Sequence, residues 1–161
     1  MDEMTIVEFK KWKLACHVEA TREAYAKIER GSPVACGCNT CKNFAAARQY
    51  AYPQEARSLL EQLGVDIDKE AEVYHNCRLE TGLHNYGGWF HFIGSIKEGP
   101  DSTRQIAENS FTFDLEPIDN RFVIGFTARA ALVARSFGDQ PVIQVEFRTE
   151  VPWIIQGPEA E

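Results

Sequence analysis

The strongest constraint on the fold is the alternation of apolar and polar side chains in the second half of the chain. Within residues 143–148, Ile143, Val145 and Phe147 alternate with polar residues, and residues 111–116 repeat the pattern. Successive side chains of a strand point to opposite faces of a sheet, so this period indicates strands with one apolar face. From Glu72 onward the sequence therefore predicts about five or six antiparallel strands.

The N-terminal half predicts one strand followed by a helical insert. The alternation from Thr5 to Val18 changes phase at Lys10 and Lys11, which indicates one long strand with a bulge at the two lysines. Residues 20–66 then favour two to three short helices, which we expect at 22–30, 42–49 and 53–63. The prediction is a single α+β domain over residues 1–161. Its antiparallel β-meander has about six to seven strands, and the Cys-bearing insert follows the first strand.

Two connections in the strand-rich half are assigned from composition. Residues 98–108 are polar and contain a Gly-Pro pair, so they predict a mobile loop. Residues 129–137 are apolar enough for a short helix or a buried strand. The Gly-Asp-Gln-Pro sequence that follows is typical of a hairpin connection, which favours the strand.

Charge and composition exclude several classes of protein. The 161 residues include 17 Lys and Arg and 24 Asp and Glu, which gives a net charge of −7. Proteins that bind the phosphate backbone of nucleic acids need positive charge, so this composition argues against that class. No apolar run reaches the roughly 18 residues that a membrane span needs. The acidic start, residues 1–5, lacks the apolar region of a secretory signal. We therefore expect a cytoplasmic globular protein that binds neither nucleic acid nor membrane.

Clustered cysteines carry the clearest chemical signal. Three of the five cysteines, Cys36, Cys38 and Cys41, lie within six residues of one another. An odd number of cysteines argues against a disulfide framework. Since structural cysteines of a core are usually scattered along the sequence, the cluster favours a metal site or a redox pair.

A structural zinc site is the interpretation that we favour for this cluster. Zinc takes four ligands in a tetrahedron and suits soft thiolates. Cys36, Cys38 and Cys41 would supply three of them around a bend that Gly37 permits, at the start of a helix that stabilises thiolates. For the fourth ligand we favour Cys77 over Cys16, with the imidazoles of His75 and His17 as substitutes.

Two other interpretations of the cysteines stay open. Cys38 and Cys41 form a Cys-x-x-Cys motif at a predicted helix start, which is typical of low-pKa thiols in redox proteins. Thioredoxin-like proteins place this motif after a strand, however, and the segment before Cys36 has room for only a short one. The third interpretation is that the three thiols bind no ligand and undergo no reaction.

The histidines suggest a second candidate site. If residues 73–80 pair with residues 88–97, His75 lies opposite His91, and Cys77 shares their face. Two imidazoles and a thiol on one face could perform acid–base or hydrolytic chemistry, with or without a metal. The alternative is that each histidine is a half-buried residue with one hydrogen bond.

These observations favour a non-enzymatic domain that zinc stabilises. We expect it to bind a protein partner or a small ligand on the aromatic-rich side of its sheet. The apolar segment Val151–Ile155 predicts a cover over a sheet edge or a homodimer contact. An enzyme that uses His75 and His91 is the first alternative, and a thiol-redox protein that uses Cys38 and Cys41 is the second.

Overall fold

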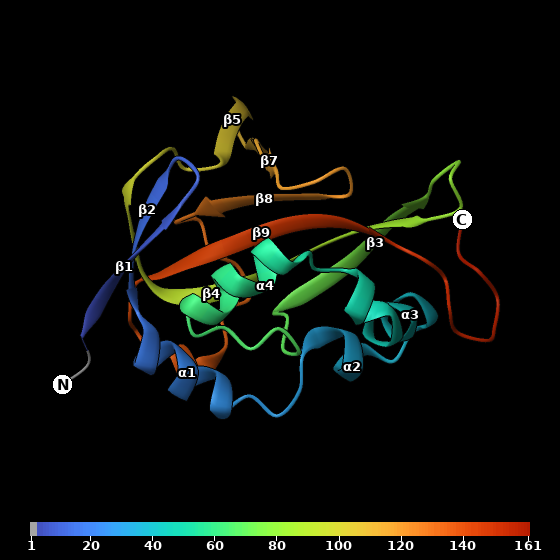
Figure 1. Ribbon diagram of the computed structural model, residues 1–161, viewed down its shortest axis with the longest axis horizontal. Coiled ribbons are helices and arrows are strands. Elements are labelled where there is room, and N and C mark those ends of the chain that lie inside the picture. Colours follow the sequence, from blue (N-terminus) through green and yellow to red (C-terminus); the bar gives the residue numbers. More distant parts are fainter. Residues whose placement is uncertain (1–2) are drawn as a thin grey trace.

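A computed structural model describes residues 3–161, so the first two residues of the acidic start lie outside it. The chain is an α+β protein, which confirms the predicted class (Figure 1). The strands within these residues are β1 (Met4–Phe9), β2 (Trp12–His17), β3 (Glu72–Arg78), β4 (His84–Glu98), β5 (Thr103–Ala107), β6 (Ser110–Phe113), β7 (Glu116–Pro117), β8 (Phe122–Thr127) and β9 (Val142–Val151). The helices are α1 (Val18–Ala26), α2 (Ser32–Cys36), α3 (Asn39–Ala47) and α4 (Gln54–Gln62), with 3-10 turns η1 (Arg48–Tyr50) and η2 (Arg135–Phe137).

Seven antiparallel strands form the main sheet. Their order is β1-β2-β4-β9-β8-β7, and β3 pairs with the first part of β4. The centre of the sheet joins β4 to β9 over ten residue pairs, from His84 opposite Val151 to Ile93 opposite Val142. The sheet is therefore a meander only in part, because its two central strands are far apart in the sequence.

The N-terminal strand prediction is wrong in one respect. Residues 4–17 form a hairpin of two strands, β1 and β2, in which Phe9 pairs with Trp12 and the two lysines form the turn. Lys10 has a φ of 50°, which a two-residue hairpin turn requires. A bulge and a tight turn produce the same change of phase in the sequence. The helical insert therefore follows two strands and not one.

The insert contains four α-helices within the described residues, more than the two to three predicted. The additional helix is α2, which begins at Ser32-Pro33 and ends before Gly37, whose φ of 75° is left-handed. Proline suits the first turn of a helix and glycine suits the position after its end. The first helix, α1, also begins earlier than the predicted residue 22, at Val18.

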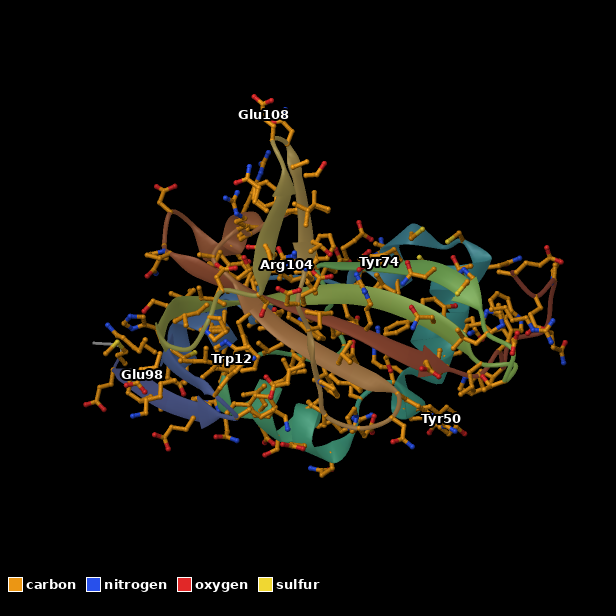
Figure 2. The ribbon with its side chains drawn as sticks, turned by 90° about the horizontal axis from the view of Figure 1, so that it is seen from above. Trp12, Tyr50, Tyr74, Glu98, Arg104 and Glu108 are labelled. Atoms are coloured by element: carbon orange, nitrogen blue, oxygen red, sulfur yellow. The ribbon has the colours of Figure 1, made fainter. Side chains whose placement is uncertain are left out.

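Two connecting segments also differ from the sequence predictions. Residues 103–113 form the separate β5–β6 hairpin, which projects from the body with Glu108 near its tip (Figure 2). Residues 129–137, predicted as a strand, are irregular until η2. Leu132 there has a φ of 54°, which a regular strand cannot include.

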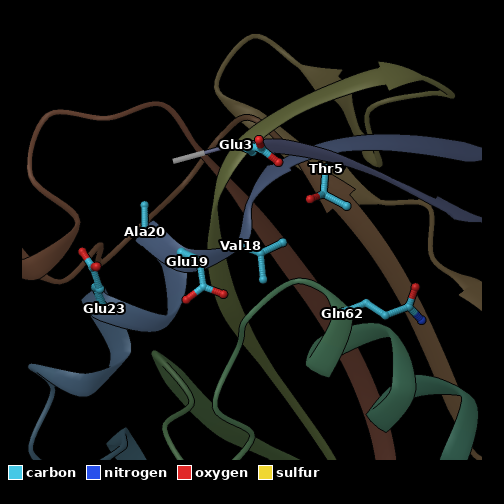
Figure 3. A pocket seen from close by; sticks show the side chains of 7 residues that line it. All are labelled: Glu3, Thr5, Val18, Glu19, Ala20, Glu23 and Gln62. Atoms are coloured by element: carbon cyan, nitrogen blue, oxygen red, sulfur yellow. The ribbon is translucent and has the colours of Figure 1, made fainter. Parts of the chain in front are cut away.

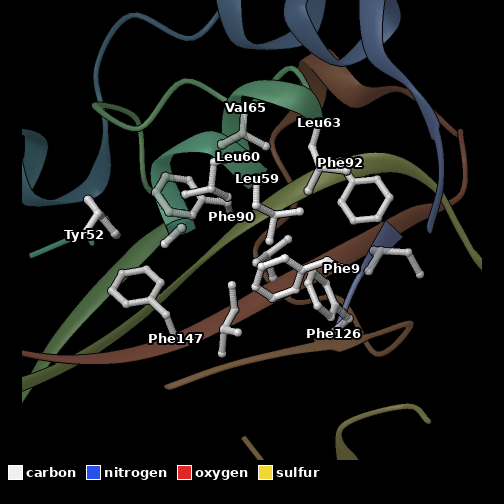
Figure 4. Packing of buried hydrophobic residues seen from close by; sticks show 14 of the residues in the cluster. Phe9, Tyr52, Leu59, Leu60, Leu63, Val65, Phe90, Phe92, Phe126 and Phe147 are labelled. Atoms are coloured by element: carbon white, nitrogen blue, oxygen red, sulfur yellow. The ribbon is translucent and has the colours of Figure 1, made fainter. Parts of the chain in front are cut away.

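The hydrophobic core lies between the sheet and the helical insert (Figure 4). Leu59 and Leu60 of α4, and Leu63 directly after it, are buried in one cluster with aromatic side chains such as Phe90 and Phe147. Burial of each such side chain contributes about 1.5–3 kcal/mol. This layer holds the insert on the sheet.

A buried ion pair joins the insert to the segment before β3. The Arg48 guanidinium donates two hydrogen bonds to Glu70, from Nε to Oε2 at 3.0 Å and from Nη2 to Oε1 at 2.9 Å. Tyr52 donates a third, from its hydroxyl to Oε2 at 2.7 Å. The Glu70 side chain is fully buried, so these donors replace the water that its charge would otherwise bind.

The opposite face of the sheet carries a buried polar row. Glu146 accepts hydrogen bonds from Gln144 Nε2 at 2.9 Å and from the Tyr74 hydroxyl at 3.1 Å. Burial raises the pKa of Glu146 from 4.5 to about 6, although both hydrogen bonds act in the other direction. The Glu146 carboxyl group therefore binds its proton more tightly in the folded state than in the unfolded chain.

We expect Glu146→Gln to stabilise the protein at neutral pH but not in acid. The raised pKa contributes stability that is fully present below about pH 4.5 and is lost as the pH rises through about 6. The loss amounts to roughly 2 kcal/mol, since one pKa unit corresponds to about 1.4 kcal/mol. Urea unfolding of both proteins at about pH 4.5 and about pH 7.5 measures the difference. If the free energies of unfolding of the two proteins differ by the same amount at both pH values, this interpretation of Glu146 is contradicted.

Candidate metal centre

The three clustered cysteines lie around one tight bend between two helices. Cys36 is the last residue of α2, and Cys38 is the N-cap residue of α3, with Cys41 in its first turn. The left-handed Gly37 between them reverses the chain, and a Cβ at this glycine would meet no other atom within 4 Å. Its conformation rather than its small size is therefore the reason for glycine at this position.

The sulfur atoms of this bend lie close together. The Sγ atoms of Cys36, Cys38 and Cys41 are all within 4.8 Å of one another, and those of Cys36 and Cys38 are 3.4 Å apart. Two sulfurs bound to one tetrahedral zinc at about 2.3 Å are about 3.8 Å apart. None of the cysteines within residues 3–161 forms a disulfide. The three sulfurs could therefore hold one metal ion after small side-chain rotations.

The surroundings of the three thiols differ. Cys38 is exposed, and the Thr40 hydroxyl, 3.3 Å from its sulfur, together with the Cys41 backbone lowers the pKa of Cys38 to about 6. Cys41 is buried, and this burial raises its pKa, as do the neighbouring sulfurs. Cys36 is exposed. One side of the cluster thus faces the protein and the other faces solvent.

Contacts with the sheet and the C-terminal tail fix the position of α3. Tyr86 of β4 donates a hydrogen bond from its hydroxyl to the Thr40 carbonyl at 2.8 Å. Asn43, fully buried, donates to the Pro152 carbonyl at 3.1 Å and accepts from the Ile154 amide at 2.7 Å. The cysteine bend is therefore attached to a rigid support on one side, next to Cys41.

The structure does not bring Cys16 or Cys77 into the group of three sulfurs. Cys16 is buried in the core, where its thiol donates to the Leu63 carbonyl at 3.3 Å. Cys77 is exposed on β3 and lies opposite Asn85, after a bulge at Asn76. The adjacent residue of β4, Tyr86, points toward α3, so Cys77 lies on the other face of the sheet. The expectation that His75 and Cys77 share a face is thus wrong, because the bulge reverses the alternation.

The two histidines of the predicted second site are also separated. His75 lies opposite Tyr86 and not opposite His91, so the predicted register is wrong. The turn that joins β3 to β4 is shorter than expected, with the Leu79 amide bonded to the Leu83 carbonyl at 2.8 Å. Since Tyr86 and His91 are an odd number of residues apart on β4, His75 and His91 lie on opposite faces of the sheet. His17, the other substitute ligand considered, ends β2 and precedes α1.

Sequence reasoning missed a chain of polar side chains at the start of β4. His75 Nε2 lies 2.9 Å from His84 Nδ1, and His84 Nε2 lies 2.8 Å from a carboxylate oxygen of Glu159. The rings of His84 and Trp153 are 5.1 Å apart. The tail that was predicted to cover a sheet edge or another copy thus packs on its own chain. Nothing in the local sequence around His84 indicates a partner 75 residues away.

A wide cavity of about 610 Å³ opens between the start of β1, the start of α1 and the end of α4 (Figure 3). Three glutamates, Glu3, Glu19 and Glu23, line it, and no residue of the cysteine bend does. An exposed acidic surface of this kind is adequately explained by solvation. We assign it no role.

Comparison with protein-family models, with curated proteins and with solved structures finds no match for this chain. Within residues 3–161, no helix has both the length and the apolar character needed to cross a membrane. The functional conclusion therefore depends on the geometry of the sites themselves.

Proposed function

We propose that Cys36, Cys38 and Cys41 bind one zinc ion, and that the chain is a non-enzymatic binding domain stabilised by this metal. The observation that carries the proposal is the convergence of three sulfur atoms within 4.8 Å of one another. Soft thiolate ligands select zinc over the hard cations. Such ligands require a reducing compartment, which agrees with the expected cytoplasmic location.

The position of the cluster supports a structural role for the ion. The helix α2 has only five residues, and isolated helices shorter than about 12 residues are marginal in water. Much of this helix is exposed, since Val34, Ala35 and Cys36 all face solvent. Packing alone therefore holds α2 weakly, and a metal bound to both Cys36 and Cys41 would attach it to the well-anchored α3.

The fourth ligand stays a prediction. Cys77 is the ligand that the sequence favours, but it lies on the face of the sheet away from α3, so the structure and the exposed side of the cluster favour a water molecule. The Cys77→Ser variant decides between them. Loss of zinc from this variant would indicate four thiolates, and retention of zinc would indicate three thiolates and a water.

Two features favour zinc over a redox pair. A Cys-x-x-Cys motif of the thioredoxin type follows a strand, whereas α2 precedes Cys38. A third thiol, Cys36, also lies 3.4 Å from Cys38, which a two-cysteine mechanism does not require. An enzyme that combines His75 and His91 is not supported either, because the two imidazoles lie on opposite faces of the sheet.

Elemental analysis of the purified protein tests the proposal. We expect about one zinc per chain in the wild type, and a large loss of zinc in Cys38→Ser and Cys41→Ser, because each removes a ligand. Lys42→Ala, an exposed change in the same helix, is the matched control and should retain zinc. A wild-type protein without zinc, or with iron or copper in its place, would refute the assignment.

A further inference from the structure

Three strands of the main sheet, β1, β3 and β7, pair on one side only within residues 3–161. Proteins usually block such an edge with proline, a bulge or a very short strand. β7 has two residues, one of them Pro117, and β3 has a bulge at Asn76. β1 has six residues and no proline, and it pairs with β2 without a shift in register. Its outer edge, at one end of the molecule in Figure 1, is therefore open to another strand.

Every second residue of β1 directs its backbone groups away from β2. Phe9 and Trp12 flank the two-residue turn of the hairpin, so they form a hydrogen-bonded pair, and bonded and non-bonded pairs alternate from there. The even-numbered residues of β1 therefore direct their N–H and C=O groups to the free side: Met4, Ile6 and Glu8. These groups have no partner in the part of the chain that the structure describes.

The side chains of the same residues form an exposed and mainly apolar strip. Met4 is 50% exposed and Ile6 is 49% exposed. They lie on the face of β1 opposite to Val7 and Phe9, which are buried in the core. Glu8 is the only charged residue of the strand. A strand added to this edge would cover apolar side chains as well as bond to free backbone groups.

The charges at the two ends of β1 favour a second copy of this chain as the added strand. Glu3 precedes the strand, and the turn of Lys10 and Lys11 follows it. Antiparallel pairing of two such edges places the acidic end of each beside the basic turn of the other, whereas parallel pairing places like charges together. Lys10 contacts Glu55 at 3.9 Å, near the upper limit for an ion pair, so it can also approach a second carboxylate.

We propose that two copies of this chain associate through β1, antiparallel and with Ile6 on the two-fold axis, so that their main sheets form one continuous sheet. This register pairs Ile6 with the partner's Ile6 and Met4 with the partner's Glu8, with two backbone hydrogen bonds in each pair. It also places Glu3 opposite the partner's Phe9, next to the partner's lysine turn. A shift of two residues in either direction leaves an outward residue of β1 unpaired. The inference goes beyond the metal site and does not depend on it.

Sedimentation equilibrium of the full chain tests the association. We expect the average mass to rise with concentration from 18.2 kDa toward twice this value, with a Kd of about micromolar or weaker because the interface is small. Ile6→Lys places like charges opposite each other on the axis and should raise the Kd at least about tenfold. Ile106→Lys, the same change at an exposed strand residue of the β5–β6 hairpin, is the matched control and should leave the Kd unchanged.

Amide hydrogen exchange of the wild type tests the register without any variant. The amides of Ile6 and Glu8 should exchange about tenfold more slowly when about nine-tenths of the chains are paired than in the monomer. The amide of Val7, which is bonded to β2, should change much less between the two concentrations.

Cysteine variants test the position of the axis. Paired residues of this type have Cα atoms about 5.5 Å apart, which a disulfide can bridge, so Ile6→Cys should form a covalent dimer on mild oxidation. Met4→Cys is the matched control, because the two Met4 positions are about 14 Å apart along the strands and should not be linked. The wild type, treated in the same way, measures the background from its exposed thiols: Cys36, Cys38 and Cys77.

Four results would overturn the inference. They are a monomer at every concentration, dissociation by Ile106→Lys but not by Ile6→Lys, exchange of the Ile6 amide that does not depend on concentration, and linkage through Met4→Cys instead of Ile6→Cys. The first and third use the wild type alone, so they hold even if a variant fails to fold.

Discussion

Replacing Arg48 with Met is expected to lower the free energy of unfolding by about 3–5 kcal/mol. The guanidinium supplies two of the three hydrogen bonds to Glu70, and the Glu70 side chain has no exposed surface. Without Arg48 the carboxylate remains buried with only the Tyr52 hydroxyl as a partner. The large decrease in stability comes from the buried Glu70 charge that is left without its partner, and not from the net stabilisation that the ion pair provides in the wild type.

Thermal and urea unfolding measure this effect. A loss of 3–5 kcal/mol corresponds to a decrease in Tm of roughly 6–20 °C for a chain of this size. Arg22→Met is the matched control, because its ion pair with Glu19 is exposed and should contribute less than about 1 kcal/mol. Adding Glu70→Gln to the Arg48 variant removes the charge and should restore part of the stability. A single Arg48 variant as stable as the Arg22 control would contradict the role of this pair.

Removing the metal is expected to lower Tm by roughly 5–10 °C. A ligand present at about 100 times its Kd stabilises the folded state by about 2.7 kcal/mol, and 1 kcal/mol changes Tm by about 2–4 °C in a chain of this size. The loss of stability should appear first in the residues around the cysteine bend. Hydrogen exchange is expected to become faster in α2 and in the first turn of α3, because these residues lose their common attachment.

Chelation of the Cys38→Ser variant is the control for this experiment. If the metal acts through the cysteine bend, a chelator should not change the Tm of a variant that no longer binds zinc. Exchange in α4 should also stay unchanged, since Leu59, Leu60 and Leu63 hold this helix by burial alone. Equal destabilisation of α2 and α4 in the wild type would contradict a local role for the ion.

The parts of the fold that local pattern determines could be predicted from the sequence. The period of two in β9 depends only on which face of the sheet is buried, and Ile143, Val145 and Phe147 are buried as expected. The leucines of α4 and the cysteine bend are equally local features. Because three cysteines within six residues cannot lie far apart, their convergence was the most secure prediction of the site.

Features that depend on distant partners or on single residues could not be predicted. The change of phase at Lys10 fits a bulge or a hairpin, and only the pairing of β1 with β2 decides between them. The bulge at Asn76 moves Cys77 to the other face, and its sequence carries no signal for this irregularity. Asn43 holds residues more than 100 positions away, so its role depends on the complete fold.

Anomalous scattering at the zinc absorption edge, measured on crystals of protein purified without added metal, tests the central claim most directly. The expected result is one strong peak about 2.3 Å from the sulfurs of Cys36, Cys38 and Cys41. Fully ordered cysteines with no peak between them would show that these side chains do not bind zinc.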